Sequence, residues 1–252
     1  MTAPDLTDAQ LDRYARHIIL REIGGAGQRR LLAAHVALVG AGGIGSPAIQ
    51  YLAASGVGRL TIVDDDRVAL SNLQRQTLYA MRDVGAHKAA MAANAVQRLN
   101  PDVAVTPIDR RIDADNARDL LAGADVVIDG SDSFATRLAV ADAALALGIP
   151  LVSAAVGPFD GQIAVYRGWE AGRPCYRCLV GADPGRADVS CADQGVVGAL
   201  TGIVGSWAAL EAIRALVPFG DDPAGRLLLI DALSMRTRTI AVPKDPACRC
   251  AG

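Results

Sequence analysis

One stretch, residues 36–66, limits the folds open to this chain because it places a glycine turn between two short apolar strands. Residues 36–39 are all apolar, and the sequence Gly-Ala-Gly-Gly-Ile-Gly follows directly at 40–45. Apolar side chains then recur at helical spacing over 46–55, and a second apolar strand at 60–63 ends in three aspartates. This order of strand, glycine turn, helix, strand and acid is typical of a βαβ unit that binds an adenosine nucleotide.

The glycines of this turn meet different steric needs. Gly40 allows the sharp bend, and Gly45 lets the helix pack closely on the strand. Gly42 and Gly43 let a phosphate or a ribose approach the backbone, where the amides of the helix start face the anion. An acid at the end of the second strand, such as Asp64, suits a ribose hydroxyl. The motif favours a bound adenosine nucleotide over a merely tight turn, but it does not distinguish NAD from ATP.

Composition limits the classes of protein to which this chain can belong. At 252 residues, 51% of them hydrophobic, it is long enough to bury a large core as one domain over residues 1–252. A formal net charge of −2 offers no basic field for nucleic acid or an anionic membrane, so we expect neither as a partner. The N-terminus lacks the pattern of a secretion signal, and the uncharged run 194–210 is too short and too rich in glycine for a membrane span. These features predict a cytoplasmic protein.

Further apolar segments predict an α/β fold with a Rossmann-like mixed sheet. Helices and strands that alternate after the first unit indicate a parallel nucleotide-binding half with helices on both faces. Residues 161–166 alternate in polarity, which favours an antiparallel continuation of the sheet. The expected elements are helices at 88–99, 116–121, 134–147 and 195–217 and strands at 103–108, 124–129, 150–154, 226–231 and 236–242.

An N-terminal helical segment, residues 7–34, precedes the first strand. Thr-Asp-Ala-Gln at 7–10 has the pattern of a capping box. Arg13 and Arg16 are three residues apart and share one side of the helix, where solvated charge is the simplest interpretation. The side chains expected on its apolar face are Leu11, Tyr14, Ala15, Ile18 and Ile19.

A polar segment, residues 68–76, follows the second strand at the sheet edge where open α/β folds bind ligands. Asn72 and Arg75 carry groups that hydrogen-bond phosphate oxygens, and the arginine does so through a bidentate fork. Lys88 begins the next predicted helix, where its charge opposes the helix dipole unless an anion lies nearby. Each residue alone reads as surface charge, but their clustering after a nucleotide turn favours a phosphate site.

A second acidic turn follows the strand expected at 124–129, again beyond the carboxyl end of a strand. Asp132 in this turn has the chemistry to hold Mg²⁺, which prefers carboxylates shared with phosphates. It is equally suited to cap the helix that begins at Phe134, and the two roles are compatible.

Four of the five cysteines form two close pairs, Cys175-x-x-Cys178 and Cys248-x-Cys250. Neither pair closes a useful disulfide loop, and a cytoplasmic protein rarely keeps disulfides, so a structural zinc site that ties the tail to the body is favoured. Cys191 stands apart in a polar loop that we expect to be exposed. An accessible thiol could be a nucleophile, but no histidine is near it in the sequence to activate it, so an inert thiol is an equally good interpretation.

Together these motifs resemble the MoeB/ThiF family of adenylyltransferases, relatives of the ubiquitin-activating enzymes that serve sulfur-carrier proteins. The likeness runs from about residue 7 to the C-terminus, and Ser-Asn-Leu-Gln-Arg-Gln at 71–76 is its most specific part. The resemblance implies ATP- and Mg²⁺-dependent adenylation of the C-terminal glycine carboxylate of a small ubiquitin-like carrier, MoaD- or ThiS-like and ending in Gly-Gly, with release of pyrophosphate. It also implies a homodimer and a separate sulfur donor, such as a desulfurase or a rhodanese. The pathway, whether molybdopterin, thiamine, tRNA thiolation or another, stays open because partner choice depends on surface complementarity.

The resemblance also implies residue roles. Asp64 would contact the ribose, Asp132 would hold the magnesium, and Arg16 would reach into the site of the other subunit. Ser133 follows Asp132 where the family often has asparagine, and Cys191 aligns with a loop cysteine that links covalently to the carrier in some members. The nucleotide-binding set expected in this chain is Gly40, Gly42, Gly43, Gly45, Asp64, Asp66, Ser71, Asn72, Arg75, Lys88, Asp132 and Ser133.

Three other hypotheses are compatible with parts of the sequence. A member that activates a free carboxylate or a peptide would use the same residues. An NAD-dependent oxidoreductase fits the glycine turn, but it leaves Asn72, Arg75 and Lys88 unexplained and has only three histidines from which to draw a proton-transfer group. A non-catalytic scaffold that binds a ubiquitin-like protein is disfavoured because the phosphate-binding residues are intact. A carboxylate nucleophile is already ionised at neutral pH, so adenylation needs no catalytic histidine.

Overall fold

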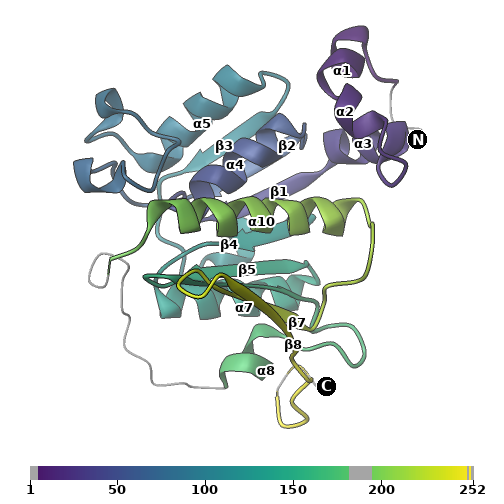
Figure 1. Ribbon diagram of the computed structural model, residues 1–252, viewed down its shortest axis with the longest axis vertical. Coiled ribbons are helices and arrows are strands. Elements are labelled where there is room, and N and C mark those ends of the chain that lie inside the picture. The colour runs from purple at the N-terminus through teal and green to yellow at the C-terminus, as the bar shows by residue number, and fades with distance from the viewer. Residues whose placement is uncertain (1–4, 182–194, 249, 251–252) are drawn as a thin grey trace.

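The computed structural model describes residues 5–181, 195–248 and 250, and eight strands of this part form one mixed sheet (Figure 1). The strand order is β3-β2-β1-β4-β5-β6-β7-β8, and the pairs from β3 to β5 are parallel while those from β5 to β8 are antiparallel. The expected mixed sheet is therefore confirmed. The strands are β1 (His35–Val39), β2 (Arg59–Val63), β3 (Ala104–Ile108), β4 (Val126–Asp129), β5 (Leu151–Val156), β6 (Asp160–Tyr166), β7 (Arg226–Asp231) and β8 (Arg236–Ala241).

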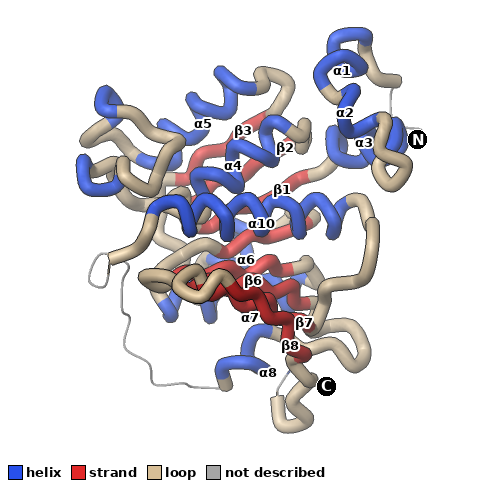
Figure 2. The backbone as a smooth tube through the Cα atoms, in the orientation of Figure 1, coloured by secondary structure: helices blue, strands red, loops and turns tan. Residues whose placement is uncertain are grey.

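Helices cover both faces of the sheet, as Figure 2 shows. Alternate strand residues divide between the faces: Val36 and Leu38 pack with α4, α5 and α10, whereas Ala37 and Val39 pack with α6, α7 and α8. This alternation follows from the two-residue period of a strand. The helices are α1 (Asp8–Arg13), α2 (Ala15–Ile18), α3 (Gly24–Ala33), α4 (Gly45–Ala54), α5 (Lys88–Leu99), α6 (Ala117–Leu121), α7 (Phe134–Leu147), α8 (Tyr176–Val180) and α10 (Gly198–Leu216), with 3₁₀ turns η1 (Leu70–Asn72) and η2 (Met81–Asp83).

The N-terminal segment follows only part of its prediction. The capping box is present, since Gln10 N donates to Thr7 Oγ1 at 3.2 Å. The expected single apolar face is wrong, because the helix is interrupted at Tyr14 and Leu11 and Ile19 are 44% and 71% exposed. Tyr14 departs from helical geometry to bury its ring, and its hydroxyl accepts a hydrogen bond from Asn100 Nδ2 at 2.9 Å. Tyr14 is buried, whereas the flanking apolar residues Leu11 and Ile19 face solvent.

Helix α10 crosses the sheet with its first turn at the carboxyl ends of the parallel strands (Figure 1). It is long and apolar enough to cross a membrane, with a mean hydropathy of 1.2, but half of that window is buried inside the protein. Close contacts with α4, β5 and β6 make it a core helix on one side. Among the described residues it is the only helix of this length and hydropathy.

Candidate active site

The glycine turn after β1 has the geometry that its sequence predicts. Gly40 has φ +88°, a conformation that side chains rarely adopt. A Cβ atom at Gly45 would lie 2.0 Å from the carbonyl oxygen of Gly40, and one at Gly40 would lie 3.1 Å from that of Gly130. The turn therefore needs glycine at both positions, and it packs directly on the loop that follows β4.

Asp64, at the end of β2, is fixed against this turn. Its carboxylate accepts hydrogen bonds from Ala41 N at 2.7 Å and from Asp66 N at 2.9 Å. Burial raises the pKa of Asp64, and the charge of Lys88 and the two amide hydrogen bonds partly oppose that rise. The carboxylate lies beside the backbone of the glycine turn, where a ribose hydroxyl would complete its hydrogen bonds.

Lys88 is the first residue of α5, and its side chain is only 6% exposed. Its Nζ lies 2.8 Å from Asp66 Oδ2, a carboxylate that is itself 68% exposed. Asp66 is therefore the anion that offsets the unfavourable position of a lysine at a helix start. The hydroxyl of Tyr79 lies 2.8 Å from Ala41 O and 3.4 Å from Lys88 O, so a buried side chain links the glycine turn to the start of α5.

The polar segment 68–76 lies against the same turn. Arg75 Nη1 donates to Ser71 O at 3.0 Å, and Asn72 Oδ1 accepts from Ala69 N at 3.1 Å. The buried amide of Gln76 approaches Gly42, where a Cβ atom would lie 3.5 Å from Gln76 Nε2.

Two buried polar atoms around the turn, Gln76 Oε1 and Ser46 Oγ, have no hydrogen-bond partner among the residues that the structure describes. Ser46 lies in the first turn of α4, directly after Gly45. Buried polar atoms in proteins are normally paired, so these two fit a site that a polar ligand completes. The donors and acceptors around the turn therefore suit a nucleotide.

The loop after β4 carries Asp132, which is exposed. The helix cap is Ser133, whose hydroxyl accepts from Thr136 N at 3.4 Å, so the alternative role of Asp132 as the cap of α7 is wrong. Ser133 has the extended backbone of a cap residue, with φ −87° and ψ 127°, and Asp132 lies one residue outside the cap. The buried guanidinium of Arg137 donates to Ser131 O and, at 2.9 Å, to Ala154 O, and so ties this loop to β5.

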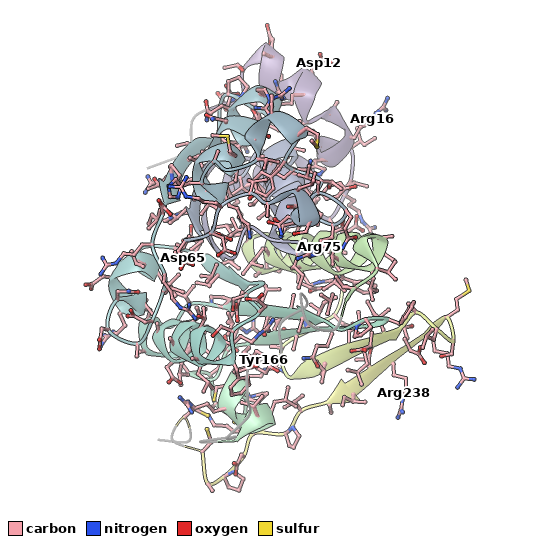
Figure 3. The ribbon with its side chains drawn as sticks, turned by 90° about the vertical axis from the view of Figure 1, so that its left-hand side faces the viewer. Asp12, Arg16, Asp65, Arg75, Tyr166 and Arg238 are labelled. Carbon is pink, nitrogen blue, oxygen red and sulfur yellow. The ribbon has the colours of Figure 1, made fainter. Side chains whose placement is uncertain are left out.

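Arg16 does not join these residues. Figure 3 shows it projecting from the N-terminal helices, away from Arg75. Its neighbour Arg13 donates to Leu99 O at 3.1 Å, and thus anchors the segment to the end of α5. Of the predicted cationic set, the structure brings Lys88 and the segment that carries Arg75 to the glycine turn and leaves Arg16 exposed elsewhere.

The paired cysteines converge, as their spacing predicts. The sulfur atoms of Cys175, Cys178, Cys248 and Cys250 all lie within 4.8 Å of one another. Burial raises the pKa of Cys175 and of Cys250, so their thiolates need a cation to be stable. Four such sulfur donors suit tetrahedral zinc. Cys191 lies outside the described residues.

Two adjoining cavities of about 190 and 260 Å³ lie at the opposite end of α10, between that helix and β6–β7. Their central polar groups already satisfy one another, since Arg214 Nε donates to Glu211 Oε2 at 2.9 Å and Trp207 Nε1 to Glu211 Oε1 at 3.1 Å. The glycine turn, by contrast, has polar atoms without partners. The candidate active site is therefore at the turn.

Sequence reasoning missed two buried residues that hold the site together, Tyr79 and Arg137. The sequence could have indicated Arg137 as a buried residue, because it is a lone arginine in an otherwise largely apolar predicted helix. Tyr79 gave no such signal, since a single tyrosine after the polar segment 68–76 has no distinctive pattern. Gln76 was part of the recognised motif, but its approach to Gly42 depends on how two distant segments pack.

Comparisons with known proteins show which chains this one is similar to. The sequence profile of the ThiF family matches residues 14–250. The chain is 48% identical over 248 residues to the SAMP-activating enzyme E1 of Haloferax volcanii (98% of this chain, 91% of the relative). It is 47% identical over 251 residues to the sulfur carrier protein adenylyltransferase of Thermus thermophilus (98% and 92%) and 40% identical over 248 residues to the molybdopterin-synthase adenylyltransferase of Escherichia coli (98% and 99%).

A solved structure shares the fold. The crystal structure of E. coli MccB with MccA-N7isoASN superposes with a TM-score of 0.83 at 22% sequence identity, covering 95% of this chain and 75% of that one. At this identity the likeness concerns the fold alone. It supports the Rossmann-like fold with a mixed sheet.

Proposed function

The chain belongs to the ThiF family and is a nucleotidyltransferase, and on that premise we propose that it adenylates the C-terminal glycine carboxylate of a small ubiquitin-like sulfur-carrier protein. ATP is the AMP donor and pyrophosphate the leaving group. The observation that carries the proposal is the convergence of Asp64, Lys88 and the Arg75-bearing segment 68–76 on the glycine turn. The buried atoms Gln76 Oε1 and Ser46 Oγ have no partner there among the described residues. Relatives named for activation of sulfur carriers support the choice of substrate.

The residue roles follow from this placement. Asp64 accepts the ribose hydroxyls, and the turn at Gly42 and Gly43 lets the α-phosphate approach the backbone. Arg75 and Lys88 bind the phosphates, Lys88 exchanging its contact with the exposed Asp66 for a phosphate oxygen.

The chemistry suits these side chains. A carrier carboxylate attacks the α-phosphorus, the bond to the bridging oxygen breaks, and the electron pair leaves with pyrophosphate. Both reactants are anions, so positioning and charge neutralisation lower the barrier more than a general base would. The fixed cations of Arg75 and Lys88 supply that neutralisation without a proton transfer.

Two metals belong to the proposal. Asp132 would hold Mg²⁺, which neutralises phosphate charge when bound, and Ser133 lies beside it. Zinc would occupy the four-cysteine cluster and fix the C-terminal tail to the first turn of α8. The donor sets fit both ions, carboxylate oxygen for magnesium and thiolate sulfur for zinc.

We also propose a homodimer in which a second copy covers the outer face of α10. Its exposed apolar residues Ile203 and Trp207 form a stripe with Leu210, at 53%, 37% and 42% exposure. Arg16 lies far from Arg75 within one chain (Figure 3), so it would complete the site of the other copy. Arg16→Ala and Lys88→Ala would each be inactive, and mixing the two would restore about a quarter of the sites if subunits exchange at random. Failure of the mixture to recover activity while both variants stay dimeric would contradict the shared site.

The remaining assignments are part of the same proposal. Residues 1–252 act as one adenylyltransferase domain in the cytoplasm, and neither nucleic acid nor a membrane is a partner. A separate sulfur donor, such as a desulfurase or a rhodanese, acts after adenylation. Cys191 would serve in that later step and not in adenylate formation, so Cys191→Ala would keep pyrophosphate exchange.

ATP–pyrophosphate exchange tests the proposed function directly. Radioactive pyrophosphate should enter ATP only when a carrier ending in Gly-Gly is present, and a carrier lacking its last glycine is the matched control. Exchange with a free carboxylate or a short peptide would instead assign a different substrate class. Oxidation of NADH without any exchange would refute adenylation.

A further inference from the structure

The first turns of α10 lie directly on two segments of the active site. A Cβ atom at Gly198 would lie 2.2 Å from Gln74 O and 3.2 Å from Arg75 Cα. Seven residues later, about two helical turns along α10, a Cβ atom at Gly205 would lie 2.2 Å from Ile44 O. The helix backbone therefore supports both the arginine-bearing segment and the glycine turn, and larger residues at these positions would push them apart.

Thr201 lies between these two contacts and is 1% exposed. Its Oγ1 lies 3.3 Å from Arg75 O and 2.7 Å from Gly198 O, so one hydroxyl hydrogen is shared between a carbonyl of its own helix and a carbonyl of the site. The same side chain comes within 3.0–3.2 Å of the position that a Cβ atom at Gly43 would take. Thr201 thus touches both segments with a single side chain.

Arg75 O has no other hydrogen-bond donor among the described residues. The guanidinium at the other end of the same residue is held by Ser71 O at 3.0 Å. Backbone and side chain of Arg75 are therefore each fixed by one contact, and a fixed cation loses less conformational entropy when it binds a phosphate.

We propose that Thr201 is a positioning residue for Arg75, its hydroxyl holding the arginine-bearing segment at a fixed distance from the glycine turn. The proposal rests on the phosphate-binding role assigned to Arg75 above. A purely structural role, in which the hydroxyl only satisfies Gly198 O within its helix, predicts a loss of stability without a specific loss of ATP affinity.

Thr201→Val removes the hydroxyl and keeps the shape of the side chain. We expect its Kd for ATP and its KM for ATP in exchange to rise roughly three- to tenfold, the range for one lost hydrogen bond. Thr201→Ser keeps the hydroxyl and should restore affinity to within about twofold. Thr61→Val is the matched control, because Thr61 is also buried and hydrogen-bonded, to His35 Nε2 at 2.8 Å, but lies in β2 away from the turn. Thr201→Ala repeats the test if valine prevents folding.

A double-mutant cycle shows whether Thr201 acts through Arg75. In an Arg75→Ala background, Thr201→Val should leave the already weakened Kd for ATP unchanged. An equal increase in both backgrounds, or a wild-type Kd for Thr201→Val alone, would overturn the positioning role while leaving adenylation intact. A wild-type Kd for Arg75→Ala would refute the phosphate role of Arg75 itself, and the inference would fall with that premise.

Discussion

Lys88→Met is expected to abolish pyrophosphate exchange without weakening the fold. The lysine is nearly buried, at 6% side-chain exposure, yet its ion-pair partner Asp66 is 68% exposed. A nearly buried charge of this kind serves ligand binding at a cost to stability. The substitution should therefore lower the affinity for ATP while it leaves the free energy of unfolding unchanged or raises it.

The sizes of the two effects follow from this asymmetry. An ion pair with an exposed acid contributes about 0–1 kcal/mol, whereas desolvating an ion costs several kcal/mol. Methionine has a similar length and carries no charge, so the free energy of unfolding should stay constant or rise by up to about 2 kcal/mol. For a chain of this size that corresponds to an increase in Tm of up to roughly 8 °C. A charge-assisted hydrogen bond to phosphate is worth about 1.5–3 kcal/mol, so the affinity for ATP should fall by about 10- to 150-fold.

Calorimetry and ATP binding measured on the same preparation would separate these effects. Lys244→Met is the matched control, because Lys244 is the only other lysine in the sequence and donates to Gly168 O at 3.1 Å, far from the turn. A clear fall in Tm for Lys88→Met would show that the lysine is a structural ion. Unchanged ATP affinity would remove it from the site and refute the reasoning.

Three further predictions concern the supports of the site. Tyr79→Phe removes the hydroxyl that lies 2.8 Å from Ala41 O, and the KM for ATP should rise about three- to tenfold with a Tm loss of a few degrees at most, as measured by exchange and calorimetry. Cys175→Ser should lower the zinc content measured by atomic absorption and reduce Tm, because a four-sulfur site loses a ligand; full zinc retention would contradict the metal assignment. Burial raises the pKa of Asp64, so the folded protein holds this proton more tightly than the unfolded chain and ionisation costs stability as the pH rises through that pKa. Since the ionised form binds ribose, ATP affinity should fall on acidification at a higher pH than for an ordinary aspartate, and Asp64→Asn should remove that pH dependence in a binding titration.

Local sequence patterns determined most of the elements. The helices α5 and α7 and the strand β7 have the predicted bounds, because helical and strand periodicities are properties of neighbouring residues. The antiparallel β6 was also predicted from its alternation. The predicted apolar face of the N-terminal helix was wrong because the helix is interrupted at Tyr14, whose hydroxyl accepts a hydrogen bond from Asn100, 86 residues away in the chain.

The residues of the candidate site likewise fall into those that the sequence predicted and those that only the tertiary structure revealed. The sequence placed Gly40, Asp64 and Lys88 at one edge, because parallel strands end together and the glycine turn has a chemical signature. Only the tertiary structure decided which side chains support them. The Thr201 hydroxyl contacts Arg75 O, 126 residues away in the chain, and the Arg137 guanidinium on α7 donates to Ala154 O on β5. Such contacts depend on how the helices cover the sheet, which no local pattern encodes.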